Sequence, residues 1–262
     1  MKLARVITTG GQTVSVAEKD GKLYRVEGNI LDAPHITDEV VDAKEWLSPI
    51  DSEAIICIGA NYKAHAEESG KDVPEYPIVF MKNLSAAIGH EQPIKIPKVC
   101  EDEVDYEAEL VVVIGKTCLN ATKANALDYV LGYTCANDVS ARIWQAVKGG
   151  SQWVRGKAFD TFAPMGPFII TSDEIPDPNT LRIQGRYNGE TVQDSNTDDM
   201  IFDVPTLIEF LSQDTTLLPG TVILTGTPEG VGWARSPKLL LKSGVVYEVE
   251  IEKVGTLKNQ VA

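Results

Sequence analysis

Two acidic side chains stand directly before an unbroken apolar run in the stretch Asp105-Tyr106-Glu107-Ala108-Glu109-Leu110-Val111-Val112-Val113-Ile114-Gly115. Residues two apart in a strand share a face, so Glu107 and Glu109 point the same way. The run that follows is apolar on both faces, which predicts a buried strand. Neighbouring carboxylates there repel each other and are costly to desolvate, and a hard cation such as Mg²⁺ is the simplest compensation. A solvated strand end is the alternative interpretation.

Strand-like segments outnumber helical ones along the chain. We expect strands at residues 55–58, 78–82, 110–115, 133–136, 167–171, 181–187, 222–225 and 247–254, and helices at 62–69, 124–131 and 201–211. The strands do not alternate regularly with long helices, which disfavours a doubly wound parallel sheet. The pattern predicts a β-rich α+β fold with a mixed sheet that is rolled or sandwiched.

The first fifty residues have a different texture. Strands are expected at 2–8, 13–16 and 22–26, and the turn signals Gly10-Gly11 and Asp20-Gly21 separate them. Ser48-Pro49 then breaks the chain. We therefore expect a small N-terminal β domain over residues 1–50 and a catalytic domain over 51–262. No residue of the first segment suggests chemistry.

Composition narrows the class of protein. The chain has 262 residues and a formal charge of −14, which disfavours nucleic acid as a partner. The same field repels an anionic substrate, so an acid needs a metal or local positive charge in the pocket. No apolar run is long enough to cross a membrane and the N-terminus does not resemble a signal peptide, so we expect a cytoplasmic protein. The four cysteines form no paired motif and are expected to be buried.

Asp138 is a third candidate metal ligand. It lies in Cys135-Ala136-Asn137-Asp138-Val139-Ser140, where an expected strand gives way to a turn or a helix. Strand ends are common positions for functional side chains. The alternative is that Asp138 caps a helix that follows it.

His65 and Glu68 are three residues apart on an expected helix, so they share a helical face. A carboxylate beside an imidazole raises its basicity and fixes its tautomer, and such a pair activates a water or relays a proton. The alternative is an incidental pair on an exposed helix. Lys157, among apolar and aromatic neighbours, and Lys82, at the end of an apolar strand, are candidates for charge near the metal, although a surface position is the default for a lysine.

A glycine-rich turn, Thr225-Gly226-Thr227-Pro228-Glu229-Gly230-Val231-Gly232, follows an expected strand. It lacks the Lys-Ser/Thr pair of a phosphate-binding loop, which argues against nucleotide binding. Its backbone amides and the Thr227 hydroxyl are suited to hold a carboxylate or an oxyanion. A plain tight turn is the alternative.

Together and in this order, the motifs resemble the fumarylacetoacetate hydrolase family. The resemblance covers about residue 55 to the end and rests on Gly59-x-Asn61-Tyr62-x-x-His65-x-x-Glu68, Phe80-Met81-Lys82, Glu107-x-Glu109, Asn137-Asp138-Val139-Ser140-Ala141-Arg142-x-x-Gln145, Gly156-Lys157-x-Phe159-Asp160, Met200-Ile201-Phe202 and Thr225-Gly226-Thr227-Pro228-x-Gly230-Val231-Gly232. It implies a mixed β-sandwich roll, a homodimer, and Mg²⁺ or Mn²⁺ as cofactor. Ala60 departs from the family, because several relatives carry Arg there.

The resemblance also implies roles for individual residues. The metal ligands would be Glu107, Glu109 and Asp138, and the catalytic residues His65, Glu68 and Lys157, with the His–Glu pair on a lid over the substrate. Substrate binding would fall to Gln145, Arg142, Thr227 and Lys82.

The expected activity is hydrolysis of a C–C bond in a small anionic 2-oxo or 1,3-dicarbonyl acid of the acylpyruvate or 2,4-diketo acid type. An oxaloacetate-type decarboxylase, a hydroxymuconate-type isomerase and a non-catalytic binding protein are the alternatives. Specificity is expected to lie in the lid after His65, in residues 148–153 and in 233–235.

Overall fold

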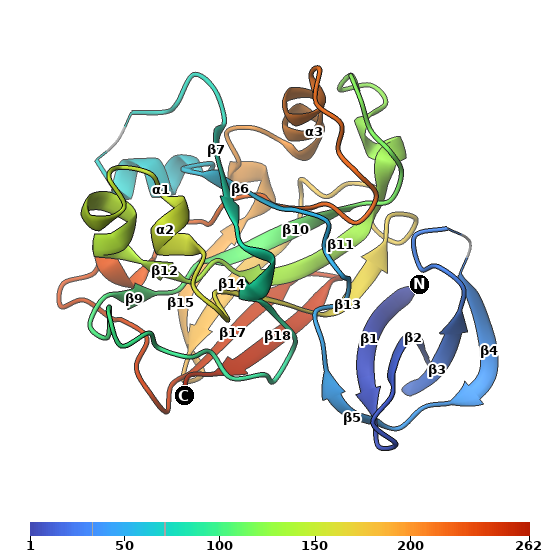
Figure 1. Ribbon diagram of the computed structural model, residues 1–262. Helices are drawn as coiled ribbons and strands as arrows, with labels where there is room; N and C mark the ends of the chain where they lie inside the picture. Colours follow the sequence, from blue (N-terminus) through green and yellow to red (C-terminus); the bar gives the residue numbers. More distant parts are fainter. Residues whose placement is uncertain (33, 71) are drawn as a thin grey trace.

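The structure is a computed structural model that describes residues 1–32, 34–70 and 72–262. Most of its strands belong to one twelve-stranded mixed sheet (Figure 1), whose main path runs in the order β4-β3-β2-β1-β13-β11-β10-β16-β6-β7. The strands of this path are β1 Lys2–Thr8, β2 Thr13–Lys19, β3 Lys22–Glu27, β4 His35–Val40, β6 Ile55–Gly59, β7 Ile78–Lys82, β10 Ala108–Ile114, β11 Val130–Asn137, β13 Ala163–Thr171 and β16 Val222–Leu224. Two short strands pair beside it, β5 (Ala43–Trp46) with β1 and β8 (Ala87–Ile88) with β13.

A second, four-stranded sheet packs across β10, β11 and β13. Its order is β15-β14-β17-β18, formed by β14 Arg182–Tyr187, β15 Glu190–Asn196, β17 Val246–Ile251 and β18 Gly255–Gln260. A two-stranded sheet joins β9 (Val104–Asp105) to β12 (Ser140–Ala141). The main core lies between the two large sheets, and every residue of β10 is buried. The predicted β-rich sandwiched fold is confirmed.

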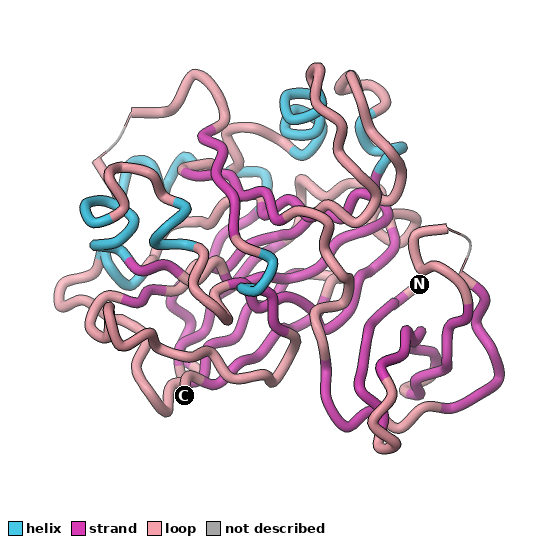
Figure 2. Tube along the Cα trace, in the orientation of Figure 1, coloured by secondary structure: helices cyan, strands magenta, loops and turns pink. Residues whose placement is uncertain are grey.

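Helices are short and lie around the sheets (Figure 2). They are α1 Lys63–Glu68, α2 Val154–Lys157, α3 Val204–Ser212, a π-helical turn at Trp144–Lys148 and 3₁₀ turns at Leu84–Ala86, Ala126–Tyr129, Thr197–Asp199 and Gly232–Ala234. The helix expected at 124–131 is wrong, because a 3₁₀ turn there leads directly into β11. The strand expected at 247–254 is formed as β17, which ends at Ile251, and a further strand, β18, follows it. Among the described residues, no helix is long and apolar enough to cross a membrane.

The N-terminal strands continue the large sheet, since β1 pairs with β13 through Lys2 and Ile170. They also enclose a small apolar cluster of their own, made of Ala4, Val6, Val14, Val16 and Val41. Figure 1 shows this segment at one end of the molecule. The predicted boundary at residue 50 stays a prediction. All four cysteines are buried and free, as expected.

Candidate active site

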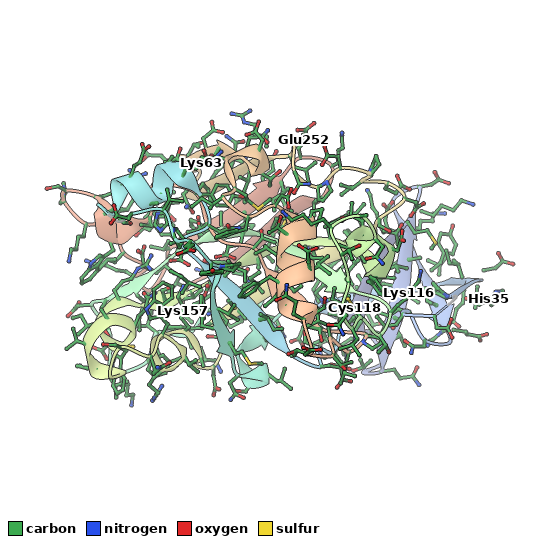
Figure 3. All side chains as sticks on the ribbon, turned by 90° about the horizontal axis from the view of Figure 1, so that it is seen from above. His35, Lys63, Lys116, Cys118, Lys157 and Glu252 are labelled. Carbon is green, nitrogen blue, oxygen red and sulfur yellow. The ribbon has the colours of Figure 1, made fainter. Side chains whose placement is uncertain are left out.

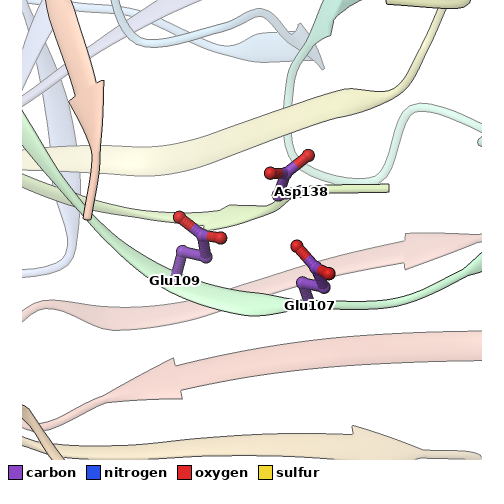
Figure 4. A group of neighbouring side chains, drawn as sticks. All are labelled: Glu107, Glu109 and Asp138. Carbon is purple, nitrogen blue, oxygen red and sulfur yellow. The ribbon is translucent and has the colours of Figure 1, made fainter. Parts of the chain in front are cut away.

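Three carboxylates converge where β10 begins and β11 ends. These strands pair antiparallel with Ala108 opposite Asn137, so Glu107 and Asp138 lie beside each other at the same end. Figure 4 shows the carboxylates of Glu107, Glu109 and Asp138 close together. One oxygen from each lies within 4.8 Å of the other two, and the residues are 5%, 1% and 0% exposed. A solvated strand end is therefore excluded. Asp138 caps no helix, because β12 follows it.

The donor set fits a hard divalent cation. Octahedral Mg²⁺ holds oxygens at about 2.1 Å, which places ligand oxygens roughly 3–4 Å apart. The observed separations need only a small closure. Burial, followed by the charges of Asp138 and Glu107, raises the pKa of Glu109 well above its ordinary value. Glu109 accepts a hydrogen bond from the Gly226 amide at 2.8 Å, but among the described residues no cation pairs with it. A bound cation would supply that charge.

Two buried lysines flank the triad. Lys157 Nζ lies 2.7 Å from Glu107 and 2.9 Å from Asp138, and Lys82 Nζ lies 2.6 Å from the other oxygen of Asp138. The side chains of both lysines are at most 2% exposed, so the surface alternative is wrong for both. Burial disfavours the charge of Glu107, but Lys157 and Arg142 outweigh it and lower its pKa to about 2.

Lys82 differs from Lys157 in what it reaches. Its ammonium also donates to the backbone oxygens of Val139 and Lys157, and it does not line the cavity described below. The structure therefore does not support direct substrate contact by Lys82. Its contacts hold Asp138 in place.

Arg142 connects the triad to a carboxylate that the sequence analysis did not assign. Its guanidinium pairs with Asp105 at 2.7 Å and with Glu107 at 2.7 Å, and it donates to Gln145 Oε1 at 3.2 Å. Asp105 also accepts hydrogen bonds from the Gly232 and Trp233 amides. Asp105 lies two residues before Glu107, so strand alternation puts both on the same face, and this spacing was the sequence signal that could have identified it.

The expected His–Glu pair is formed on α1. His65 Nδ1 lies 3.4 Å from Glu68 Oε2, and both Glu68 oxygens accept the Gly230 amide at 3.1 Å. Burial opposes ionisation of Glu68, but the hydrogen bonds from His65 and Gly230 outweigh it and lower its pKa. An ionised Glu68 only accepts, so a neutral His65 carries its proton on Nδ1 and presents the Nε2 lone pair.

A cavity of about 430 Å³ brings together the predicted site residues other than Asp138 and Lys82. His65, Glu68, Glu107, Glu109, Arg142, Gln145, Lys157 and Thr227 all line it. Apolar walls come from Ile58, Phe80, Trp153, Val231 and Trp233. Gln145 reaches it from the π-helical turn, a feature common at functional sites.

The segments expected to set specificity contribute Ser69, Trp153, Trp233 and Ala234 to the cavity. Lys71, in the predicted lid, lies outside the described residues. Ala60 also lines the cavity and has a left-handed backbone, with φ of 51°.

Comparison with known proteins agrees with this geometry. The fumarylacetoacetate (FAA) hydrolase C-terminal family matches residues 54–262. The chain is 50% identical to the mitochondrial oxaloacetate tautomerase fahd2 of Xenopus laevis over 216 residues, covering 82% of this chain and 67% of that protein.

Two solved structures match along the whole chain. The 5-carboxymethyl-2-hydroxymuconate delta-isomerase of Mycobacterium smegmatis is similar with a TM-score of 0.87 and 36% identity, covering 100% of this chain and 99% of that one. A fumarylacetoacetate hydrolase of Exiguobacterium antarcticum gives a TM-score of 0.86 and 35% identity with the same coverage. The family match, the full-length structural similarity and the buried acidic triad together show that this chain belongs to the fumarylacetoacetate hydrolase family.

Proposed function

We propose that this protein is an enzyme that uses Mg²⁺ or Mn²⁺ to move a proton between the enol and keto forms of a small 2-oxo dicarboxylic acid such as oxaloacetate. The observation that carries the proposal is the placement of the His65–Glu68 pair on the same cavity as Glu107 and Glu109, two of the three carboxylates of the triad. The names of the Xenopus relative, an oxaloacetate tautomerase, and of the Mycobacterium protein, a hydroxymuconate delta-isomerase, both describe isomerisation of an organic acid.

The local charge supports an anionic substrate. Four carboxylates, of Asp105, Glu107, Glu109 and Asp138, lie among three cations, of Lys82, Arg142 and Lys157, which leaves a formal charge of −1. A divalent cation changes the charge of this group to +1, and with the ionised Glu68 on the same cavity the sum is 0. The cavity with its metal then carries no net negative charge to repel an anion, although the chain as a whole carries −14.

Each side chain has a defined part in the proton transfer. When bound between the three carboxylates, the metal would polarise a carbonyl oxygen as a Lewis acid. The Nε2 lone pair of His65 takes the proton from the carbon beside that carbonyl and delivers it to the resulting enolate oxygen, and the reverse transfer regenerates the keto form, while Glu68 stabilises the imidazolium. Gln145 lines the cavity and its Oε1 accepts from Arg142, so its Nε2 is the side-chain atom that remains to donate to a substrate.

Hydrolysis of a C–C bond in an acylpyruvate is the second candidate. The same Nε2 lone pair can accept a proton from water, and the cavity is far larger than the roughly 30 Å³ that a water takes up. Decarboxylation, the third possibility within the family resemblance, does not strictly require His65.

The experiment is a comparison of His65→Ala with His35→Ala under saturating Mg²⁺ or Mn²⁺. His35 is exposed at the opposite end of the molecule from Lys157 (Figure 3), so its loss serves as a matched control. We expect His65→Ala to lower tautomerisation of oxaloacetate and hydrolysis of acylpyruvates by about 10²–10⁴-fold. Enol loss is followed by ultraviolet absorbance and pyruvate release by a coupled assay.

The outcomes separate the candidates. Oxaloacetate tautomerisation by the wild type without acylpyruvate cleavage supports the isomerase chemistry, and the reverse supports the hydrolase. Undiminished activity of His65→Ala would show that His65 is not the proton carrier. Release of CO₂ that survives this substitution would favour decarboxylation.

We also propose that two copies of the chain pair through β7. This strand ends the large sheet and exposes Ile78, Val79 and Met81 by 37%, 43% and 46%. The opposite edge, β4, carries the acidic residues Asp38 and Glu39, which discourage strand pairing.

Light scattering on a sizing column tests the pairing. Val79→Lys is expected to shift a dimer toward monomer, whereas Val40→Lys, at an exposed valine on β4, leaves the mass unchanged. A monomeric wild type, or a dimer insensitive to Val79→Lys, contradicts the assignment.

A further inference from the structure

Gln193 lies on β15 of the four-stranded sheet, and its side chain joins two segments that surround the cavity. The residue is 1% exposed. Its Oε1 accepts from the Ala108 amide at 2.9 Å, between Glu107 and Glu109 in the sequence, and from the Tyr247 hydroxyl at 2.7 Å. Its Nε2 donates to Thr227 Oγ1 at 2.8 Å and to the Pro228 carbonyl at 2.9 Å. One amide therefore connects the carboxylate strand to the turn that carries Thr227.

The partners fix the orientation of this amide. The Ala108 N–H can only donate and the Pro228 carbonyl can only accept, so Oε1 and Nε2 cannot be exchanged. Thr227 Oγ1 accordingly accepts from Gln193, which leaves its own hydroxyl hydrogen free to donate. Thr227 lines the cavity, so a ligand atom that meets this hydroxyl is best matched as an acceptor.

Two glycines let the backbone come close enough to the Gln193 side chain and its strand for these hydrogen bonds to form. A Cβ at Gly185 would lie 2.1 Å from the Tyr247 hydroxyl and 3.0 Å from Gln193 Oε1. A Cβ at Gly230 would lie 2.1 Å from the Val192 carbonyl, and Gly230 has a φ of +95°. Larger side chains at either position would separate β15 from its partners.

We propose that Gln193 is a positioning residue for substrate recognition, which holds Thr227 as a hydrogen-bond donor to a substrate carboxylate and fixes the turn relative to Glu107 and Glu109. That the ligand group is a substrate carboxylate rests on the proposed function. That the Thr227 hydroxyl acts as a donor rests only on the contacts of Gln193. This assigns a role in the site to the four-stranded sheet, through a residue that does not itself line the cavity.

The test is a double-mutant cycle with oxalate, an unreactive dicarboxylate, as the probe. In Gln193→Glu, the new carboxylate accepts the Thr227 hydroxyl hydrogen and removes that donor from the cavity. Calorimetry under saturating Mn²⁺ is expected to show oxalate affinity lowered about 10-fold or more by Gln193→Glu and by Thr227→Val. The double variant is expected to match Thr227→Val within about twofold, because both changes remove the same donor. Thr227→Ser keeps the hydroxyl and is expected to keep the affinity.

The readouts separate positioning from folding. Gln193→Met, which offers no hydrogen bond, replaces Gln193→Glu if the latter is unstable, and thermal unfolding accompanies every variant. Gln193→Met is expected to lower the oxalate affinity less than Gln193→Glu does, and this loss of affinity is also expected to disappear when Thr227→Val is already present. Additive penalties, unchanged oxalate affinity in Gln193→Glu, or absence of oxalate binding by the wild type overturn the proposal. Failure of the wild type to tautomerise oxaloacetate, with the oxalate cycle as expected, overturns the proposed function instead.

Discussion

Two ion pairs of this protein have similar distances but different surroundings. One joins Arg25 and Glu39 on the N-terminal strands, and the other joins Lys157 and Asp138 beside the cavity. The first spans 2.7 Å with side chains 25% and 56% exposed. The second spans 2.9 Å with side chains 2% and 0% exposed. Water screens the surface pair, so it contributes little to stability. The buried pair lost its hydration on folding, so removing either partner is costly.

This contrast bears on whether the buried charges serve stability or function. A buried group of charges is weak evidence for stability, because apolar residues of similar volume often serve as well. Here the carboxylates also outnumber the cations, which leaves Glu109 without an ion pair among the described residues. That imbalance is destabilising until a cation enters. We therefore attribute the group to function rather than to stability.

The largest expected effect is on metal binding. Glu109→Gln keeps the shape of the side chain but removes the charge, so we expect Mg²⁺ or Mn²⁺ affinity to fall by more than about 100-fold and activity to be lost. Calorimetry with each metal measures the affinity, and Glu101→Gln, at an exposed acid in the preceding loop, is the control. Equal absence of binding in wild type and variant would favour the non-catalytic alternative.

The same substitution is expected to raise the stability of the metal-free protein by on the order of 1 kcal/mol, because a glutamine avoids the cost that burial imposes on Glu109, either as an unpaired charge or as proton uptake on folding. Urea titration with a chelator present measures the free energy of unfolding. A less stable metal-free variant would contradict the view that Glu109 is kept at a cost to stability.

The next effect is on the buried ion pairs themselves. Lys82→Met removes the cation on one oxygen of Asp138, and we expect a loss of about 3 kcal/mol in the free energy of unfolding. Lys98→Met, at an exposed lysine, is the matched control and should be neutral. If Lys82→Met loses no more free energy of unfolding than Lys98→Met, the buried ion pairs are no more important to stability than the surface pairs.

The smallest expected effect is at the surface. Arg25→Ala breaks the pair with Glu39, and we expect no measurable change in melting temperature, because both groups keep their hydration. Thermal unfolding at low and high salt checks this, since a contributing pair would weaken with added salt. A drop comparable to that of Lys82→Met would show that burial is not what separates the pairs.

Much of the candidate site could be predicted because it follows local rules. Alternation placed Glu107 and Glu109 on one face, and the three-residue spacing paired His65 with Glu68, both as the structure has them. Asp105 and Gln193 were missed, because their importance comes from partners more than thirty residues away. The alternation of Asp105 with Glu107 indicates a shared strand face but not these contacts, and Gln193 stands in the strand pattern without any such signal.

The errors have physical causes as well. The segment 124–131 was expected to be a helix but forms only the 3₁₀ turn Ala126–Tyr129. From Val130 onward β11 continues the sheet pairing, which overrides the local helix propensity. Lys82 was predicted to bind the substrate, but its ammonium contacts Asp138 and two backbone carbonyls, and the residue does not line the cavity.

The chemical groups of this protein follow from its amino-acid sequence alone: a β-rich chain, three carboxylates suited to a hard cation, an imidazole with its carboxylate, and a turn rich in backbone donors. Side-chain chemistry and the periods of strand and helix are local properties, so they can be read along the chain. Only the tertiary structure decided how many cations face those carboxylates, and which atom of Gln193 faces Thr227. Such balances depend on distances between segments that lie far apart in the chain, and local patterns do not encode them.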